Sequence, residues 1–138
     1  MRSALRSVAA VVAGFVAASV VMMAVEWTNG HVLYPGLGKS AEGVTDPEKV
    51  RALMASAPVG ALLVVICGWA LGSLVGGRVA AWIAARAMTA HGLVVGVLLT
   101  LAGIANNLMI PPPLWFWVAS LAVMIPAAWV GARLAPAR

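Results

Sequence analysis

VGALLVVICGWALGSLVGGRVAAWIAA, residues 59–85, is an apolar run long enough to cross a bilayer as one helix, which takes about 20 residues. Small residues recur in it at every fourth position: Gly68, Gly72, Gly76, Ala80 and Ala84. Four-residue spacing stacks side chains on nearly one helix face, and in a membrane a face of small residues lets another helix backbone approach closely. The stretch therefore predicts a packed transmembrane helix with a glycine-zipper face.

The composition is typical of a membrane protein. Of the 138 residues, 63% are hydrophobic and 9% are charged, whereas about 25% of residues are charged in ordinary soluble domains. Three further apolar runs are long enough to cross a bilayer, so we expect spans at about 8–26, 58–86, 91–110 and 114–134. The sequence predicts a single integral membrane domain over residues 1–138, an all-α protein with four transmembrane helices in a compact bundle.

The net charge of +5 is arranged as a topology signal and not as a nucleic-acid site. One side of the four-span arrangement carries only basic residues, which are Arg2, Arg6, Arg78, Arg86, Arg133 and Arg138. The other side carries the acidic residues Glu26, Glu42, Asp46 and Glu48, together with Lys39, Lys49 and Arg51. An excess of Lys and Arg marks the cytoplasmic side. We therefore expect both termini in the cytoplasm, a retained signal anchor as the first span, and the lipid bilayer rather than nucleic acid as the partner.

Residues 27–57 form the one sizeable segment outside the expected spans. Its first part, Thr28 to Gly38, is rich in turn-forming residues and predicts a loop. Thr45-Asp-Pro-Glu48 then predicts a helix start, with Thr45 as the cap residue and Pro in the first turn. Apolar residues follow at helical spacing as far as Ala57. We expect a short amphipathic helix in the outer loop between the first and second spans.

Small residues also recur at four-residue spacing in the first and third spans, at Ala10, Gly14 and Ala18 and at Gly92, Gly96 and Thr100. These matching faces lead us to expect the second span to be the hub of the bundle. Its small face drifts by about 40° at each step of four residues, so Gly68 and Gly72 should touch one neighbour and Ala80 and Ala84 another. The predicted helix-packing residues are Gly14, Gly68, Gly72, Gly76, Ala80 and Gly96.

Several motifs resemble those of a known group of membrane proteins. They are Glu26-Trp27 at the end of the first span, GWALGSLVGG at 68–77, GIANNLMIP at 103–111, PLWFW at 113–117 and the closing Gly131-Ala-Arg133. Spread over nearly the whole chain, they resemble small uncharacterised four-helix proteins of the bacterial inner membrane. The resemblance implies that membrane and four helices, and it brings no known activity or site.

The most specific polar grouping is expected at the outer ends of the spans. If the first and third spans adjoin, Glu26 could accept a hydrogen bond from the amide of Asn106 or Asn107. One interpretation is a polar clasp that holds helix ends together, and the other is an outward-facing pocket for a small ligand, with an aromatic wall. The candidate ligand-binding residues are Glu26, His31, Trp69, Asn106, Asn107 and Trp115.

Patterns for catalysis or metal binding are missing from the sequence. It shows no nucleophile–base pair, phosphate loop or metal-ligand spacing, and His31 and His91 are expected on opposite sides of the membrane. We expect no catalytic residue, metal or cofactor, and an enzyme is not favoured. The leading hypothesis is a non-enzymatic inner-membrane bundle that acts in binding or assembly, as a homo-oligomer or with a membrane-protein partner. The alternative is a small-molecule carrier or ligand-binding protein with an outward-facing pocket near Glu26 and Asn106.

Overall fold

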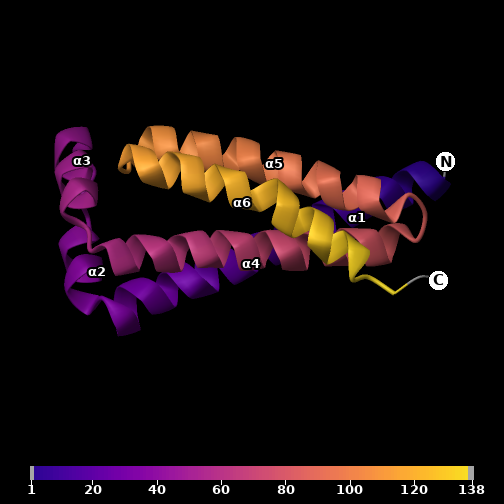
Figure 1. The fold of residues 1–138 in the computed structure, drawn as a ribbon, viewed down its shortest axis with the longest axis horizontal. Helices are drawn as coiled ribbons and strands as arrows, with labels where there is room; N and C mark the ends of the chain where they lie inside the picture. Colours follow the sequence, from indigo (N-terminus) through magenta and orange to yellow (C-terminus); the bar gives the residue numbers. More distant parts are fainter. Residues whose placement is uncertain (1, 137–138) are drawn as a thin grey trace.

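The computed structural model describes residues 2–136, which form helices and no strand. Four helices are long and apolar enough to cross a membrane, and they pack as a bundle (Figure 1): α1 (Arg2–Thr28), α4 (Val59–Ala84), α5 (Met88–Met109) and α6 (Leu114–Arg133). The prediction of an all-α bundle of four membrane-spanning helices is confirmed. Two members of the predicted charge pattern, Arg138 and the side chain of Arg2, lie outside the described part of the chain.

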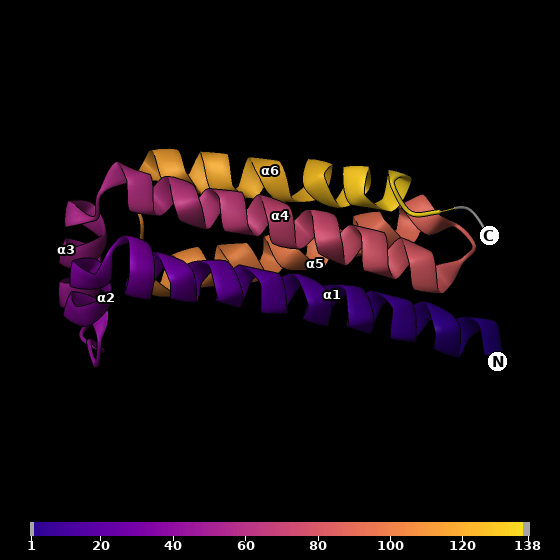
Figure 2. The same ribbon diagram turned by 90° about the horizontal axis from the view of Figure 1, so that it is seen from below.

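The bundle has two distinct ends. α1 begins and α6 finishes at one of them, beside the turn between α4 and α5, and we call it the terminal end (Figure 1). Two short helices, α2 (Pro35–Ala41) and α3 (Pro47–Ser56), lie across the opposite end, which we call the cap end. Figure 2 shows α1 and α6 on opposite sides of α4. α4 packs against the other three long helices and is the hub of the bundle, as predicted for the second span.

From Gly68 to Ala80 the four-residue row of α4 lies against α1, where a separate neighbour was expected for Ala80, and Gly76 also meets Val95 of α5. A Cβ atom added to Gly76 would lie 2.6 Å from the carbonyl oxygen of Gly14, and one added to Gly14 would lie 2.8 Å from the Cβ of Ala80. Nearer the cap end, a Cβ atom added to Gly68 would meet the side chain of Val25 at 2.7 Å. α1 can follow this row because its contacting residues are small towards the terminal end, at Gly14 and Ala18, and larger towards the cap end, at Met22 and Val25.

A different set of small residues brings α6 against α4 and α5. A Cβ atom on Gly77 would strike the backbone of Ala128, and one on Gly131 would strike the backbone of Leu74. Gly96, which we expected to offer a face to the second span, lies against α6, since an added Cβ atom would be 2.9 Å from the Cβ of Ala128. Four-residue spacing does not predict this interface, because Gly77 falls outside the series that contains Gly76.

Helices replace the predicted loop at the cap end. α1 continues into one π-helical turn, η1 (Asn29–Leu33), and α2 follows with Pro35 as its first residue. Proline suits this position because the N–H that it lacks would have no helical partner there. α3 is present as predicted, but its cap residue is Asp46 and not Thr45. The Asp46 carboxylate accepts a hydrogen bond of 2.9 Å from the backbone N–H of Glu48.

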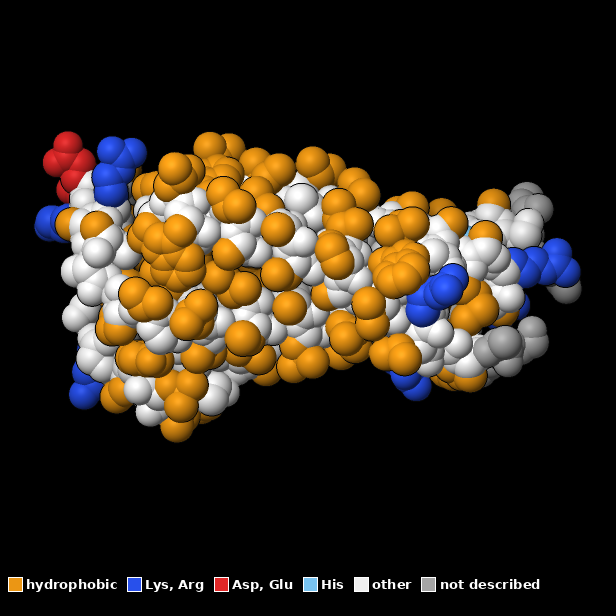
Figure 3. Space-filling model, in the orientation of Figure 1, with side chains coloured by type: hydrophobic (Ala, Val, Ile, Leu, Met, Phe, Trp, Pro, Cys, Tyr) orange, Lys and Arg blue, Asp and Glu red, His pale blue; other side chains and the backbone are white. Residues whose placement is uncertain are grey.

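Apolar and charged side chains are separated along the bundle. Figure 3 shows hydrophobic side chains over the middle, Lys and Arg at both ends, and acidic side chains at the cap end. Large hydrophobic side chains are exposed on each long helix, for example Val12 on α1, Leu71 on α4, Leu101 on α5 and Val118 on α6. This is the distribution of a multi-pass membrane protein, whose lipid-facing surface is apolar and whose backbone is hydrogen-bonded within helices.

Candidate functional site

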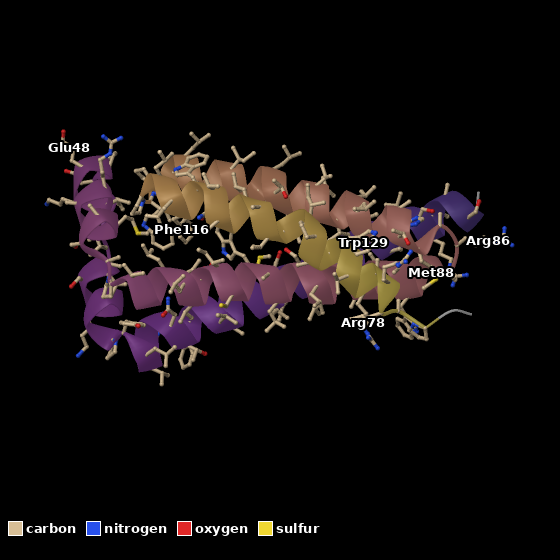
Figure 4. The ribbon with its side chains drawn as sticks, in the orientation of Figure 1. Glu48, Arg78, Arg86, Met88, Phe116 and Trp129 are labelled. Atoms are coloured by element: carbon tan, nitrogen blue, oxygen red, sulfur yellow. The ribbon has the colours of Figure 1, made fainter. Side chains whose placement is uncertain are left out.

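A cavity of about 250 Å³ lies at the cap end, between the ends of the long helices and the short helices α2 and α3. Its wall is mainly apolar and includes Leu37, Leu53, Met54, Leu62, Val65, Ile110, Pro112 and Phe116. Its polar lining consists of the side chains of Glu26, Asn29, Asn106 and Asn107. Figure 4 shows Phe116 near the cap end, between α6 and α4. A mainly apolar cavity with a few convergent polar groups is the usual form of a small-molecule site.

The carboxylate of Glu26 is held by the indole of Trp69. Trp69 Nε1 donates a hydrogen bond of 2.9 Å to Glu26 Oε1, which joins the end of α1 to α4. The Trp69 side chain is 4% exposed, and its ring meets the ring of Phe116 edge-on with centroids 5.8 Å apart. The prediction of an asparagine donor to Glu26 is therefore wrong. Within residues 2–136, the second carboxylate oxygen, Oε2, has no hydrogen-bond partner.

Two buried asparagine oxygens of the cavity lining have no hydrogen-bond partner among the described residues. Asn29 is 6% exposed, and its Nδ2 donates to the carbonyl oxygen of Ala61 at 3.0 Å while its Oδ1 is unpaired. Asn107 is 1% exposed, and its Nδ2 donates to Ser120 Oγ at 3.4 Å while its Oδ1 is also unpaired. An unpaired buried acceptor costs about 1–3 kcal/mol, so a donor bound at these oxygens would stabilise the cap end.

The neighbouring residues Asn106 and Asn107 have different surroundings. Consecutive residues of a helix point about 100° apart, and here Asn107 turns towards α6 while Asn106 stays exposed at the edge of the cavity. Asn107 therefore supplies a buried acceptor, whereas Asn106 supplies a polar group that an incoming molecule would meet first.

His31 and Trp115 lie apart from the cap-end cavity. His31 is exposed on η1, stacks on Trp27 with ring centroids 4.7 Å apart, and lines a separate hollow beside α2. Trp115 is 40% exposed and meets the edge of the Phe116 ring without lining the cavity. Of the predicted ligand-binding residues, the cavity brings together Glu26, Asn106 and Asn107, and Trp69 is joined to them through its hydrogen bond.

Sequence reasoning missed Asn29 and Phe116. Asn29 was assigned to a loop, yet it follows Glu26 by three positions, which puts both on one side of a helix that continues through η1. That spacing was the available signal. Phe116 stands between Trp115 and Trp117 in a run typical of interface anchors, and nothing in the run indicates which ring turns inward.

The charge around the cavity has one sign. Glu26 is its only ionisable lining residue within the described chain, with no Lys, Arg or His side chain in the wall. In residues 2–136, no group of three or more His, Cys, Asp or Glu side chains is placed to hold a metal ion. The cavity offers a carboxylate and unpaired acceptors, so it favours a ligand that donates hydrogen bonds or carries positive charge.

No protein-family model, curated protein or solved structure matches this chain. The geometry of the cap-end cavity is therefore the basis for assigning a function.

Proposed function

We propose that this protein is a ligand-binding protein of the bacterial inner membrane whose cap-end cavity holds a small molecule. The observation that carries the proposal is the pair of buried, unpaired oxygens, Oδ1 of Asn29 and Oδ1 of Asn107, which belong to two residues that line the same cavity as Glu26. A clasp that only joins helices is expected to pair its own buried polar groups, because leaving them unpaired costs free energy. A binding site leaves them for its ligand.

Ligand binding explains more of the structure than assembly does. Assembly was motivated by small-residue faces in excess of what one neighbour needs. Those faces have partners within the described chain, since Gly76 lies against Gly14 of α1 and Gly77 lies against Ala128 of α6. Assembly with further copies or with a membrane-protein partner stays a prediction, but it leaves the unpaired oxygens of the cavity unexplained.

The proposed location rests on the sequence resemblance and on charge. The motifs from Glu26-Trp27 to Gly131-Ala-Arg133 resemble bacterial inner-membrane proteins. Arg78 and Arg86 lie towards the terminal end and Glu48 lies at the cap end (Figure 4), which favours cytoplasmic termini. A reporter that is active only in the cytoplasm should therefore be active when it is fused after Arg138, and a reporter that is active only after export should be inactive there. An exported carboxyl terminus would contradict this orientation.

Native mass spectrometry of the protein extracted in mild detergent tests ligand binding. We expect a small-molecule adduct on the unaltered protein and its loss in Glu26→Gln, because the amide still accepts from Trp69 but no longer carries charge. Glu48→Gln is the matched control, since Glu48 is exposed on α3 and does not line the cavity. An adduct retained equally in both variants, or missing from the folded unaltered protein, would contradict the proposal.

A further inference from the structure

A second cavity adjoins the cap-end cavity from the side of the bundle, and we call it the side cavity. It has a volume of about 230 Å³, and its wall is formed mainly by apolar side chains of α1, α5 and α6: Phe15, Met22, Leu99, Ala102 and Met124. Glu26 and Asn106 line both cavities. The polar groups therefore stand where the two cavities meet.

The side cavity lies within the apolar part of the bundle. Phe15 precedes Glu26 by eleven positions on α1, which corresponds to about 16 Å along a helix. Of the four long helices, α1 has the smallest fraction of buried residues, and it packs chiefly on α4. Met23, which also lines the side cavity, is 67% exposed on the apolar outer surface of α1. An apolar chain from the bilayer can therefore reach this cavity between α1 and α5.

The groups at the junction select a cation that donates hydrogen bonds. Glu26 is the only ionisable residue that lines either cavity within the described chain. The unpaired oxygens of Asn29 and Asn107 add acceptors on the cap side. The buried rings of Trp69 and Phe116 border the same region, and aromatic rings attract a neighbouring cation. An anionic head would meet the Glu26 carboxylate, and none of the described residues that line either cavity is basic.

We infer that the ligand is a single-chain amphiphile with a primary ammonium head, which binds at Glu26 while its hydrocarbon tail lies in the side cavity. This inference rests on the proposed function and names the class of its ligand. An ammonium group has three N–H donors. Glu26 Oε2 is a free acceptor where the cavities meet, and Asn29 and Asn107, which line the cap-end cavity, carry the unpaired acceptors Oδ1. The two cavities together have the volume usual for a small-molecule site, about 300–1,000 Å³.

Thermal unfolding in a non-ionic detergent, followed by circular dichroism, measures the binding of defined probes. Dodecylamine should raise the melting temperature in a concentration-dependent way, because a ligand of the folded state stabilises it by mass action. Sodium dodecanoate, with a similar tail and the opposite charge, should give no such rise. Propylamine, with the same head and almost no tail, should bind at least about tenfold more weakly.

Two pairs of variants locate the head and the tail. Ala102→Phe fills the side cavity and should weaken dodecylamine binding about tenfold, whereas Ala105→Phe, exposed on the same helix and lining neither cavity, should leave it unchanged. Glu26→Gln should weaken the binding of both amines, and Glu48→Gln should not. Helical content and melting temperature without probe show whether each variant is folded.

Equal binding of dodecylamine and dodecanoate, or unchanged dodecylamine affinity in a folded Ala102→Phe variant, would overturn the inference. Propylamine binding as tight as that of dodecylamine, and lost in Glu26→Gln, would refute the tail site while leaving the proposed function intact. Equal binding of the amines to the unaltered protein and to Glu26→Gln would refute the ammonium site. In that case the adduct seen by native mass spectrometry decides the proposed function separately.

Discussion

Trp69 Nε1 lies 2.9 Å from Glu26 Oε1 and donates a hydrogen bond to it. The bond ties α1 to α4 near the level where the side chain of Val25 fills the space opposite Gly68. It engages one carboxylate oxygen of Glu26 and leaves the other without a partner in residues 2–136. One indole therefore both holds the helices together at the cap end and orients the carboxylate of the cavity.

Replacing this indole should destabilise the bundle modestly. Trp69→Phe keeps an aromatic ring against Phe116 but removes the N–H donor, so the free energy of unfolding should fall by about 1 kcal/mol. Unfolding by a denaturing detergent, followed by circular dichroism, measures the change. Trp115→Phe is the control, since Trp115 is 40% exposed and should be nearly neutral. Equal stability of the two variants would contradict the role given to Trp69.

Substitution by alanine should have different effects at two glycines, because Gly76 lies in the contact between α1 and α4 and Gly36 does not. Gly76→Ala should lower the free energy of unfolding by about 1–3 kcal/mol, because the added methyl group would lie 2.6 Å from the backbone oxygen of Gly14. Gly36→Ala in α2 meets no atom within 4 Å and should be neutral or stabilising by up to about 1 kcal/mol. The same unfolding assay measures both variants. An unchanged free energy of unfolding in Gly76→Ala would rule out the close approach of the two backbones.

The turn between α4 and α5 contains alanines where glycine would be less strained. Ala85, which follows the last residue of α4, has a φ of +57°, a left-handed conformation that costs a residue with a Cβ atom about 1 kcal/mol or more. Ala85→Gly should therefore raise the free energy of unfolding by about 0.5–1 kcal/mol. Ala90→Gly, at an exposed helical position of α5, should lower it by a similar amount. A loss of stability in both would contradict the left-handed turn.

The long helices could be predicted from sequence because length and hydropathy alone specify them. α4 and α6 each lie within two residues of their expected spans. The cap end was harder to predict. Pro35 and the glycines after it are typical of turns, but proline is also favoured as the first residue of a helix, and Pro35 is the first residue of α2. In the structure α2 contributes Leu37, Gly38 and Ala41 to the cavity wall, a tertiary contact that local sequence does not specify.

The neighbours of each helix face could not be predicted, because they depend on rotation and on side-chain size. A drifting row of small residues fits two neighbours or one, and the row on α4 meets α1 from Gly68 to Ala80, with the larger side chains of Met22 and Val25 towards the cap end. The burial of individual site residues could not be predicted for the same reason. Asn106 and Asn107 are equivalent in sequence, and only Asn107 lies on the buried side of α5, where it contacts Ser120 of α6.

A crystal structure of the protein grown from a lipidic mesophase, after gentle extraction from its native membrane, tests the central claim most directly. We expect non-protein density in the cap-end cavity, in contact with Glu26, with Oδ1 of Asn29 or Asn107, and with the ring of Phe116. A cavity closed by the side chains of Leu53 and Met54, with both asparagine oxygens paired to protein atoms, would contradict ligand binding at this site.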